Sequence, residues 1–398
     1  MNESAPLSPA AEEAAAAGFL DPRCRFEFAA MCFAAFLFSV THNYSALLAI
    51  VFERNGHSLQ STGLLLSLFA VTCIAGALLS SAACARFGVL NTARIAFLLT
   101  ALGMGAFAFT RDDFWLALLS RLVQGLGVGA AMPAGLVYVQ SRINAKRFVY
   151  FVTVYSAVIP LAAAFAPPIG QWTMLRFGET ALFVEAAIPA LLAILCTIGL
   201  RDAPRPRNAG GLNLGNAFQR KLILPYVMIF AGGGLYGFSV NYLAADLQDR
   251  AIALAAFFVP SSIALVAMRF IAMRALSQYS LRLLVTASLL TYGLGFVLIV
   301  LAGGPVLMII GAVFYGIGNS IMFPVVSAWV GEGFEPRDRA GPQAVNTASF
   351  YTAIYALPWP QTFIIGAWGY AATEWMWAGV AFVLGLYMLA MLGLKRIR

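Results

Sequence analysis

The chain has 398 residues, of which 61% are hydrophobic and only 11% are charged, and its mean hydropathy is +0.83. A soluble domain of this length would lack the polar surface needed to cover so large an apolar core, which excludes an ordinary soluble protein. The net charge of +8 does not require a nucleic-acid partner, because the basic residues flank apolar segments, where lipid headgroups lie.

Twelve continuous apolar stretches are long enough to cross a hydrocarbon core of roughly 30 Å. Those of the first half are 27–51, 61–84, 93–110, 114–139, 148–172 and 180–200. Those of the second half are 222–245, 251–273, 283–302, 306–331, 343–367 and 374–394. The sequence therefore predicts an all-α membrane protein with twelve transmembrane helices, arranged as two pseudo-symmetric six-helix bundles.

Lysine and arginine alternate between the loops that connect these stretches. One side of the membrane would hold 19 of them: Arg23, Arg25, Arg86, Arg94, Arg142, Lys146, Arg147, Arg201, Arg205, Arg207, Arg220, Lys221, Arg274, Arg282, Arg337, Arg339, Lys395, Arg396 and Arg398. The other side would hold 4: Arg54, Arg111, Arg176 and Arg250. By the positive-inside rule, we expect both termini in the cytoplasm and the protein in the inner (plasma) membrane of the cell.

Polar segments divide the chain into regions. Residues 1–26 are acidic and rich in alanine, which predicts a disordered cytoplasmic tail and not a cleavable signal peptide. The Pro-, Gly- and Arg-rich segment 201–221 is expected to link a bundle at 27–200 to a second at 222–394, with 395–398 as a cytoplasmic C-terminus.

Several chemistries find no support in the sequence. The five cysteines and two histidines show no disulfide framework and no metal-ligand spacing, so no metal or cofactor is expected. The run GLGVG at 125–129 lies in an apolar helix with no preceding strand, which favours close helix packing over phosphate binding. No catalytic triad or nucleotide-binding loop is present, so we do not expect an enzyme.

Glycine and proline positions repeat with an offset of 191 residues. Gly125, Gly127 and Pro133 correspond to Gly316, Gly318 and Pro324, Pro167 corresponds to Pro358, and Gly178 corresponds to Gly369. These residue types mark kinks and close contacts, so the coincidences predict two similar bundles. In transporters built this way, the substrate site lies at mid-depth between the repeats.

Three motifs resemble those of the major facilitator superfamily, and the resemblance extends over essentially the whole chain. RLVQGLGVGAAMP (121–133) resembles that family's Arg-x-x-Gln-Gly-x-Gly motif, and APPIGQ (166–171) resembles, in part, a motif of proton-antiporting exporters. ARFGVL (85–90) lies where the family has a charged loop, of which Arg86 and Gly88 match. The resemblance implies an alternating-access carrier, with gating roles for Arg86, Gly88, Pro167, Gly170 and Arg269; for Arg269, plain anchoring at the headgroups is an equal alternative.

Ionisable residues inside the spans are candidate functional groups, because burying a charge in a membrane is costly. Arg121 shares a helical stripe with Gln124 and is expected to face the cavity, where it influences proton binding or holds an anionic group; the alternative is a structural hydrogen-bond hub. His42 lies in the middle of the first span and can titrate near neutral pH, so it is the preferred proton carrier. Packing or substrate contact are its alternatives. Glu185 is a further proton-coupling candidate or an interfacial anchor.

Uncharged polar and aromatic residues in the central spans are expected to contact the substrate, or else to join helices. The full set of candidate substrate-binding residues is His42, Asn43, Tyr44, Arg121, Gln124, Tyr155, Tyr236, Asn241, Tyr315, Asn319, Asn346, Tyr351 and Tyr355. A net-positive, aromatic cavity favours neutral or anionic amphiphiles over cations.

We expect a monomeric secondary active transporter that exports a small organic compound, with protons as the coupling ion. Alternatives are an importer or facilitator of a metabolite, and a membrane sensor or assembly factor without transport.

Overall fold

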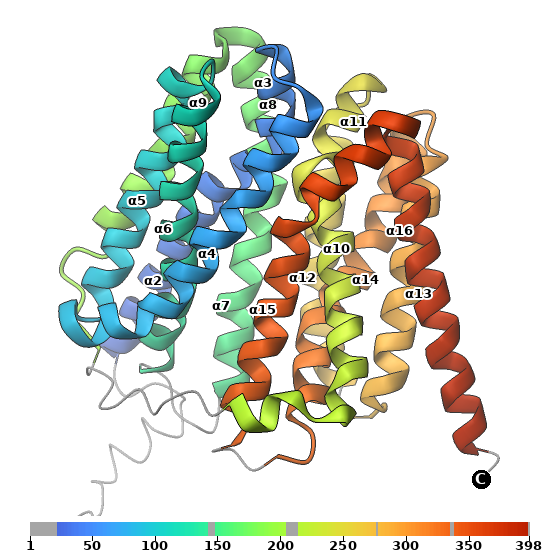
Figure 1. Ribbon diagram of the computed structural model, residues 1–398. Coiled ribbons are helices and arrows are strands. Elements are labelled where there is room, and N and C mark those ends of the chain that lie inside the picture. Colours follow the sequence, from blue (N-terminus) through green and yellow to red (C-terminus); the bar gives the residue numbers. More distant parts are fainter. Residues whose placement is uncertain (1–21, 142–147, 204–213, 276–277, 335–337, 397–398) are drawn as a thin grey trace, which may run out of the picture.

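The computed structural model describes residues 22–141, 148–203, 214–275, 278–334 and 338–396. The described chain is almost entirely helical and forms two bundles side by side, the first in blue to green and the second in yellow to red (Figure 1). The first helix begins and the last helix ends at the same end of the molecule, at the bottom of Figure 1. We call this end the terminal face and the other end the opposite face.

The first bundle comprises α2 (Pro22–Asn43), η1 (Tyr44–Leu47), α3 (Leu48–Arg54), α4 (Leu59–Phe87), α5 (Val89–Thr110), α6 (Phe114–Gln140), α7 (Phe148–Leu161), η3 (Ala162–Ala164), α8 (Ala166–Phe177) and α9 (Glu179–Cys196). The second comprises η4 (Leu214–Phe218), η5 (Arg220–Leu222), α10 (Ile223–Asn241), α11 (Leu243–Asp249), α12 (Ala255–Ala275), α13 (Leu281–Val300), α14 (Pro305–Gly331), α15 (Ala340–Ala356) and α16 (Pro358–Arg396).

Ten segments within the described ranges are long and apolar enough to cross a membrane. One of them, Gly341–Gly393, contains two spans, because Gly369 has a non-helical backbone with φ 78° and ψ 174°. The shorter apolar helix Ala255–Ile271 provides one more. The described residues therefore contain the twelve transmembrane helices and the two-bundle architecture expected from the sequence.

Element boundaries differ modestly from expectation. Within the described residues α2 extends back to Pro22, before the expected start at residue 27. Arg23 and Glu27 then pair one turn apart at 3.4 Å. The rest of the expected tail, the centre of the expected linker and residues 397–398 lie outside the described residues. At its other end, the expected linker forms the short helices η4 and η5.

The 191-residue repeat coincides with matching breaks in the helices. Pro167 lies at the start of α8 and Pro358 at the start of α16, so the fifth and eleventh spans are interrupted at equivalent positions. Gly178 and Gly369 both have positive φ, 87° and 78°, and each separates two spans. Only glycine adopts this conformation without strain, which explains why both positions carry it.

The glycines of the GLGVG segment let α6 approach its two neighbours closely. A Cβ atom added to Gly129 would lie 1.9 Å from the carbonyl oxygen of Cys73 in α4. A Cβ atom on Gly127 would lie 2.6 Å from the carbonyl oxygen of Ala96 in α5. The segment is thus a packing surface between α4 and α5.

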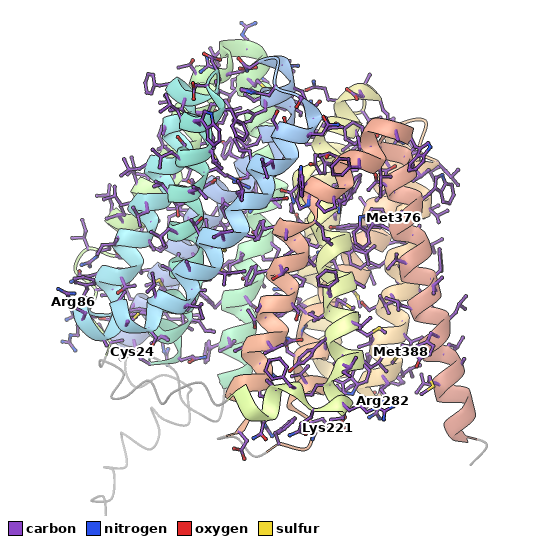
Figure 2. The ribbon with its side chains drawn as sticks, viewed as in Figure 1. Cys24, Arg86, Lys221, Arg282, Met376 and Met388 are labelled. Carbon is purple, nitrogen blue, oxygen red and sulfur yellow. The ribbon has the colours of Figure 1, made fainter. Side chains whose placement is uncertain are left out.

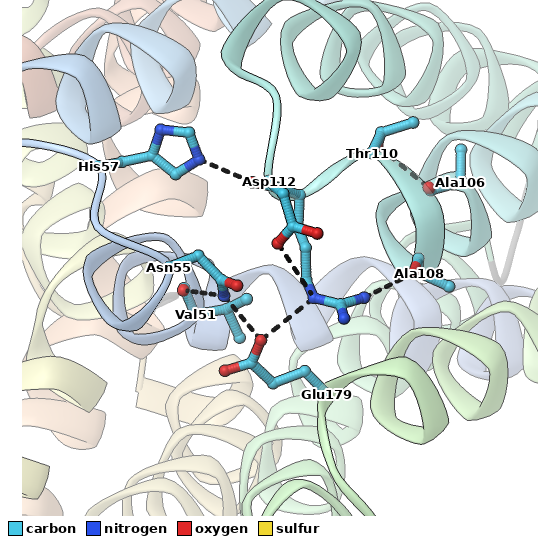
Figure 3. A network of polar contacts seen from close by, with 9 residues as sticks. Val51, Asn55, His57, Ala106, Ala108, Thr110, Asp112 and Glu179 are labelled. Atoms are coloured by element: carbon cyan, nitrogen blue, oxygen red, sulfur yellow. Dashed lines mark hydrogen bonds and ion pairs between the residues drawn. The ribbon is translucent and has the colours of Figure 1, made fainter.

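An ion-pair network joins three helices of the first bundle at the opposite face (Figure 3). Arg111, after α5, pairs with Glu179 at the start of α9 (3.2 Å), and Glu179 accepts a hydrogen bond from Asn55 after α3 (2.7 Å). His57 bonds to the carbonyl oxygen of Arg111 at 2.7 Å. This network fixes the relative positions of the first, third and sixth spans.

The second bundle has a similar network at its own opposite face. Arg250 pairs with Asp246 of α11 at 2.9 Å and with the fully buried Glu374 of α16 at 3.8 Å, and it donates to the carbonyl oxygens of Ile299 (2.8 Å) and Ala302. It thereby connects the seventh, ninth and twelfth spans. Asn55 and Asp246 are 191 residues apart, so the repeat extends to this polar layer.

Contacts between the two bundles are tight toward the opposite face. The Ser67 hydroxyl on α4 donates to the carbonyl oxygen of Ala356 (3.2 Å) and accepts from the backbone N–H of Trp359 (2.8 Å). Nearer the surface, the Tyr370 hydroxyl donates to Glu53 at 3.1 Å. These contacts bring α3 and α4 of the first bundle against the eleventh and twelfth spans.

Candidate functional site

A small pocket, with a cavity volume of about 20 Å³, lies at the centre of the molecule between the two bundles. The first bundle contributes His42, Asn43, Ser45, Ala46 and Arg121. The second contributes Tyr236, Val240, Asn241, Phe258 and Tyr355. We call it the central pocket. Its lining comes from α2, η1 and α6 on one side and from α10, α12 and α15 on the other, so a bound molecule would contact both bundles.

Arg121 provides the positive charge of the central pocket. Its side chain is 1% exposed, and Nη1 donates to the Ser45 hydroxyl (2.9 Å) and to Oε1 of Gln124 (2.5 Å). The guanidinium carbon lies 4.1 Å from the centre of the Phe69 ring, a cation–π contact. Its Nε has no hydrogen-bond partner among the described residues. The partners are neutral, so the guanidinium charge is not cancelled locally.

His42 lies beside Arg121 and contacts the second bundle. Its Nε2 is 3.0 Å from the Tyr355 hydroxyl, and its ring stacks on Phe69 at 5.8 Å. Its Nδ1 is buried and has no hydrogen-bond partner among the described residues. The imidazole therefore joins the bundles through one nitrogen and has a second nitrogen available for a proton or a ligand.

Aromatic rings from the second bundle continue from the pocket along α15. Tyr355 contacts Phe69 at 4.6 Å, and Tyr351 stacks on Tyr355 at 6.2 Å with nearly parallel planes. Phe350 stacks in turn on Tyr236 of α10 at 6.2 Å. Such a surface can hold an apolar or aromatic group by stacking, without adding charge.

Other residues of the candidate set serve as ties within the first bundle. Tyr44 points away from the pocket and donates to Glu185 of α9 at 2.7 Å. Gln124 is fully buried and holds Ser45 (3.1 Å) together with Arg121. The Tyr155 hydroxyl lies against Gly135 of α6. Asn43, which lines the pocket, donates to the carbonyl oxygen of Ser39 at 2.8 Å.

The candidates of the second bundle are likewise divided. Asn241 lines the pocket and donates to the carbonyl oxygen of Ile354 at 3.1 Å, joining α10 to α15. Tyr315 bonds to Ser239 and packs among Phe257, Tyr292 and Phe296 in the bundle core. Asn346 donates to Ser327 at 3.0 Å, and Asn319 on α14 is half-buried. Neither Tyr315, Asn319 nor Asn346 lines the central pocket.

The five gating candidates lie at helix ends and between bundles. Arg86 is exposed at the terminal face (Figure 2), and Gly88 has a φ of 88° beside Asp202, which accepts from the N–H of Leu90 at 2.9 Å. Pro167 starts α8, and Gly170 permits close approach of Tyr44 and Leu47. Arg269 of α12 donates to the carbonyl oxygen of Ser156 in α7 at 2.5 Å, and so connects the two bundles.

The sequence alone did not identify several residues that contact the charged groups. Ser45 binds both Arg121 and Gln124, but no pattern connects residues so far apart in the chain. Phe69, whose ring faces Arg121, is one of many phenylalanines in the sequence. Glu374 could have been identified, because it is an acidic residue in an apolar stretch of the sequence. No group of residues suited to holding a metal ion occurs in the described part of the chain.

Comparisons with known proteins agree with this architecture. The family profile described as Major Facilitator Superfamily matches residues 28–224. Multidrug resistance protein MdtL of Shewanella sp. (strain ANA-3) is 31% identical over 97 residues, and the aligned part spans about a quarter of each chain, 24% of both.

Solved structures resemble the whole chain. The inward open xylose transporter XylE from E. coli has a TM-score of 0.72 at 16% identity and covers 92% of this chain and 94% of its own. A POT family transporter in complex with 5-aminolevulinic acid has a TM-score of 0.76 at 14% identity, with coverages of 91% and 95%. These neighbours are transporters and not enzymes. Their likeness shows that the whole chain has the fold of these transporters. The profile match over residues 28–224 assigns the chain to the major facilitator superfamily.

Proposed function

We propose that this protein is a secondary active transporter that works by alternating access and exports a small neutral or anionic amphiphile in exchange for protons. The observation that carries the proposal is the central pocket, which lies between the bundles and combines one buried guanidinium with aromatic rings. A pocket lined by both repeats is the place where a carrier can release its cargo to either side as the bundles rock.

The charge of the pocket favours an anionic or neutral cargo over a cationic one. No carboxylate is among the residues that line it in the described part of the chain, whereas Arg121 is buried there beside neutral partners. An organic cation would therefore meet repulsion, and a carboxylate, phosphate or sulfonate would pair with the guanidinium. The rings of Tyr236 and Tyr355 suit an apolar portion of the same molecule.

Proton coupling is assigned to His42. An imidazole can take up and release a proton, and Nδ1 of His42 is buried without a hydrogen-bond partner among the described residues. Because His42 bonds to Tyr355 of the second bundle, a proton on the ring alters a contact between the bundles. Glu185, bonded to Tyr44 away from the pocket, is the second candidate.

The proposed direction is export, and two similarities support it. APPIGQ at 166–171 resembles the exporter motif, and the matched relative from Shewanella is named as a multidrug resistance protein. An importer or facilitator is the alternative, favoured by the structural likeness to a xylose transporter. We propose that the protein acts as a monomer in the inner (plasma) membrane, with both termini in the cytoplasm, as the distribution of basic residues indicates.

The test begins with a screen for cargo and continues with a matched pair of variants. Purified protein is screened for thermal stabilisation by metabolites and antimicrobial compounds, since a bound ligand raises apparent stability. Transport of a hit is then measured in vesicles with an imposed pH gradient. His42→Gln should bind and exchange cargo but lose accumulation driven by the gradient. His57→Gln is the control, because the only other histidine bonds to the Arg111 carbonyl in the peripheral network.

The outcomes separate the alternatives. Proton-driven uptake into right-side-out vesicles, with no efflux, would establish the importer. If His42→Gln still concentrates cargo as the unaltered protein does, then His42 is not the proton carrier, and Glu185→Gln is tested next. If neither His42→Gln nor Glu185→Gln changes the effect of the pH gradient on transport, the protein is a facilitator. Failure to find any translocated ligand would favour a sensor or assembly factor.

A further inference from the structure

A second hollow lies at the terminal face of the second bundle, away from the central pocket. Its cavity volume is about 180 Å³. It lies where η5, α13, α14 and the end of α16 meet, and Figure 2 shows Lys221, Arg282 and Met388 there. All of its lining residues belong to the second bundle, so it is not part of the space between the bundles.

The hollow combines two cations with an apolar wall. Lys221 is exposed, rests on the Phe334 ring at 3.9 Å and has no ion pair among the described residues. Arg282 lies 5.6 Å from the centre of the Trp329 ring. The buried Trp329 and Met388 contribute to the lining together with Met391, which is 38% exposed, and Leu392. One side can thus accept an anion and the other a hydrocarbon chain.

The charge of the site is not fully balanced. Arg282 pairs with Glu332 at 3.6 Å, but their side chains are 41% and 56% exposed. Exposed ion pairs contribute little stability, so a stronger anion can displace the Glu332 carboxylate. Two cations against one carboxylate leave a net positive site at a helix boundary rich in basic residues.

We propose that this hollow binds one anionic phospholipid from the leaflet at the terminal face. Its phosphate would lie between Lys221 and Arg282, and an acyl chain would lie along Met391 and Leu392. Basic pockets between transmembrane helices bind anionic headgroups in this manner, and a tryptophan is typical of the membrane interface. The site differs from general anchoring of basic residues, because the two cations lie beside an apolar wall within one hollow.

Binding is tested with the purified full-length protein in a neutral detergent. Phosphatidylglycerol is titrated, and native mass spectrometry measures the fraction of protein that retains one lipid, with phosphatidylcholine and inorganic phosphate as comparison ligands. We expect the protein to retain phosphatidylglycerol and to retain much less phosphatidylcholine. Inorganic phosphate should not displace the bound phosphatidylglycerol. Lys221→Gln and Arg282→Gln should each weaken binding about fivefold, and together about 25-fold.

Two further variants make the test specific. Arg220→Gln removes an exposed charge next to Lys221 but outside the hollow, and should change affinity less than about twofold. Glu332→Gln releases Arg282 from its partner, and should strengthen binding about two- to fivefold. This gain remains informative even if the double variant folds poorly.

Three results would overturn the proposal. In the first, Arg220→Gln weakens binding as much as Lys221→Gln, which would indicate general charge attraction at the membrane surface. In the second, inorganic phosphate at the same concentration displaces the lipid completely, which would indicate a site for free anions. In the third, the Lys221→Gln/Arg282→Gln protein, folded by circular dichroism, retains phosphatidylglycerol as the unaltered protein does.

Discussion

Replacing Ser67 with alanine should open the side of the protein that the two bundles close together. The hydroxyl makes two bonds to the eleventh span, at 3.2 Å to the Ala356 carbonyl and at 2.8 Å from the Trp359 N–H. A net contribution of about 1 kcal/mol for each bond gives about 2 kcal/mol in total. This corresponds to a factor of about 30 in the ratio of closed to open molecules, so a protein about 99% closed would become about 77% closed.

The opening can be measured as a distance between spin labels at the opposite face. Asp112→Cys in the first bundle and Gly303→Cys in the second place the labels on exposed loops, and the half-buried Cys196 is replaced by serine to keep labelling specific. Double electron–electron resonance should then show a second, longer distance in Ser67→Ala.

Two controls isolate the hydroxyl of Ser67 from other effects. Ser67→Thr keeps the hydroxyl group and should restore the short distance. Ser61→Ala should leave the distances unchanged, because Ser61 is on the same helix but bonds only to Ser58. If Ser67→Ala gives the same distance distribution as the unaltered protein, the two bonds do not hold the bundles together and the reasoning is wrong.

Three stability predictions follow from packing and charge, each checked by thermal unfolding in detergent. Gly129→Ala should destabilise by about 1–3 kcal/mol, because its Cβ would lie 1.9 Å from a backbone oxygen of α4; Gly379→Ala, with nothing within 4 Å, should be neutral or slightly stabilising. Gly369→Ala should cost about 1–2 kcal/mol from its φ of 78° alone, since the space around it is open. Arg250→Gln should cost about 3–5 kcal/mol by leaving buried carboxylates unpaired, and adding Glu374→Gln should recover part of the loss.

The spans and their breaks were predictable because their signals are local. A membrane span requires a continuous apolar stretch, and proline or glycine at a fixed offset indicates where the backbone must bend. Pro167 and Pro358 both lie in the first turn of a helix, and Gly178 and Gly369 take the same unusual conformation.

The lining of the central pocket was only partly predictable, because the first span is not a uniform helix. Residues 44–47 form a 3₁₀ turn between α2 and α3, and this changes the direction of each side chain along the span. His42 and Ser45 therefore line the pocket, whereas Tyr44 turns toward Gly170 and Glu185. A regular helical projection cannot reveal this difference.

Partners far apart in the chain were not predictable at all. Arg121 and Ser45 are 76 residues apart, and their contact depends on how α6 packs against the first span. Asp246 lies beyond the end of α10, where sequence indicates only a boundary, and its contact with the network of Glu374 depends on the fold of α11. Polar networks of this kind follow from tertiary packing, for which a single sequence carries no periodic signal.

The helix breaks explain how one contact between the bundles can be both specific and reversible. A break frees backbone N–H and C=O groups, which must find partners inside a membrane. At the break of the eleventh span, Pro358 has no N–H to donate to the Ile354 carbonyl, and Asn241 of the second bundle donates to that carbonyl at 3.1 Å instead. Ser67 of the first bundle bonds to the Ala356 carbonyl and to the Trp359 N–H. The partner from the second bundle moves together with the eleventh span when the bundles separate, whereas Ser67 does not. Separation of the bundles therefore breaks only the two hydrogen bonds made by Ser67 at this break. Water that enters the opened side can bond to the exposed groups, so the free-energy cost of opening at this break is limited to these two bonds.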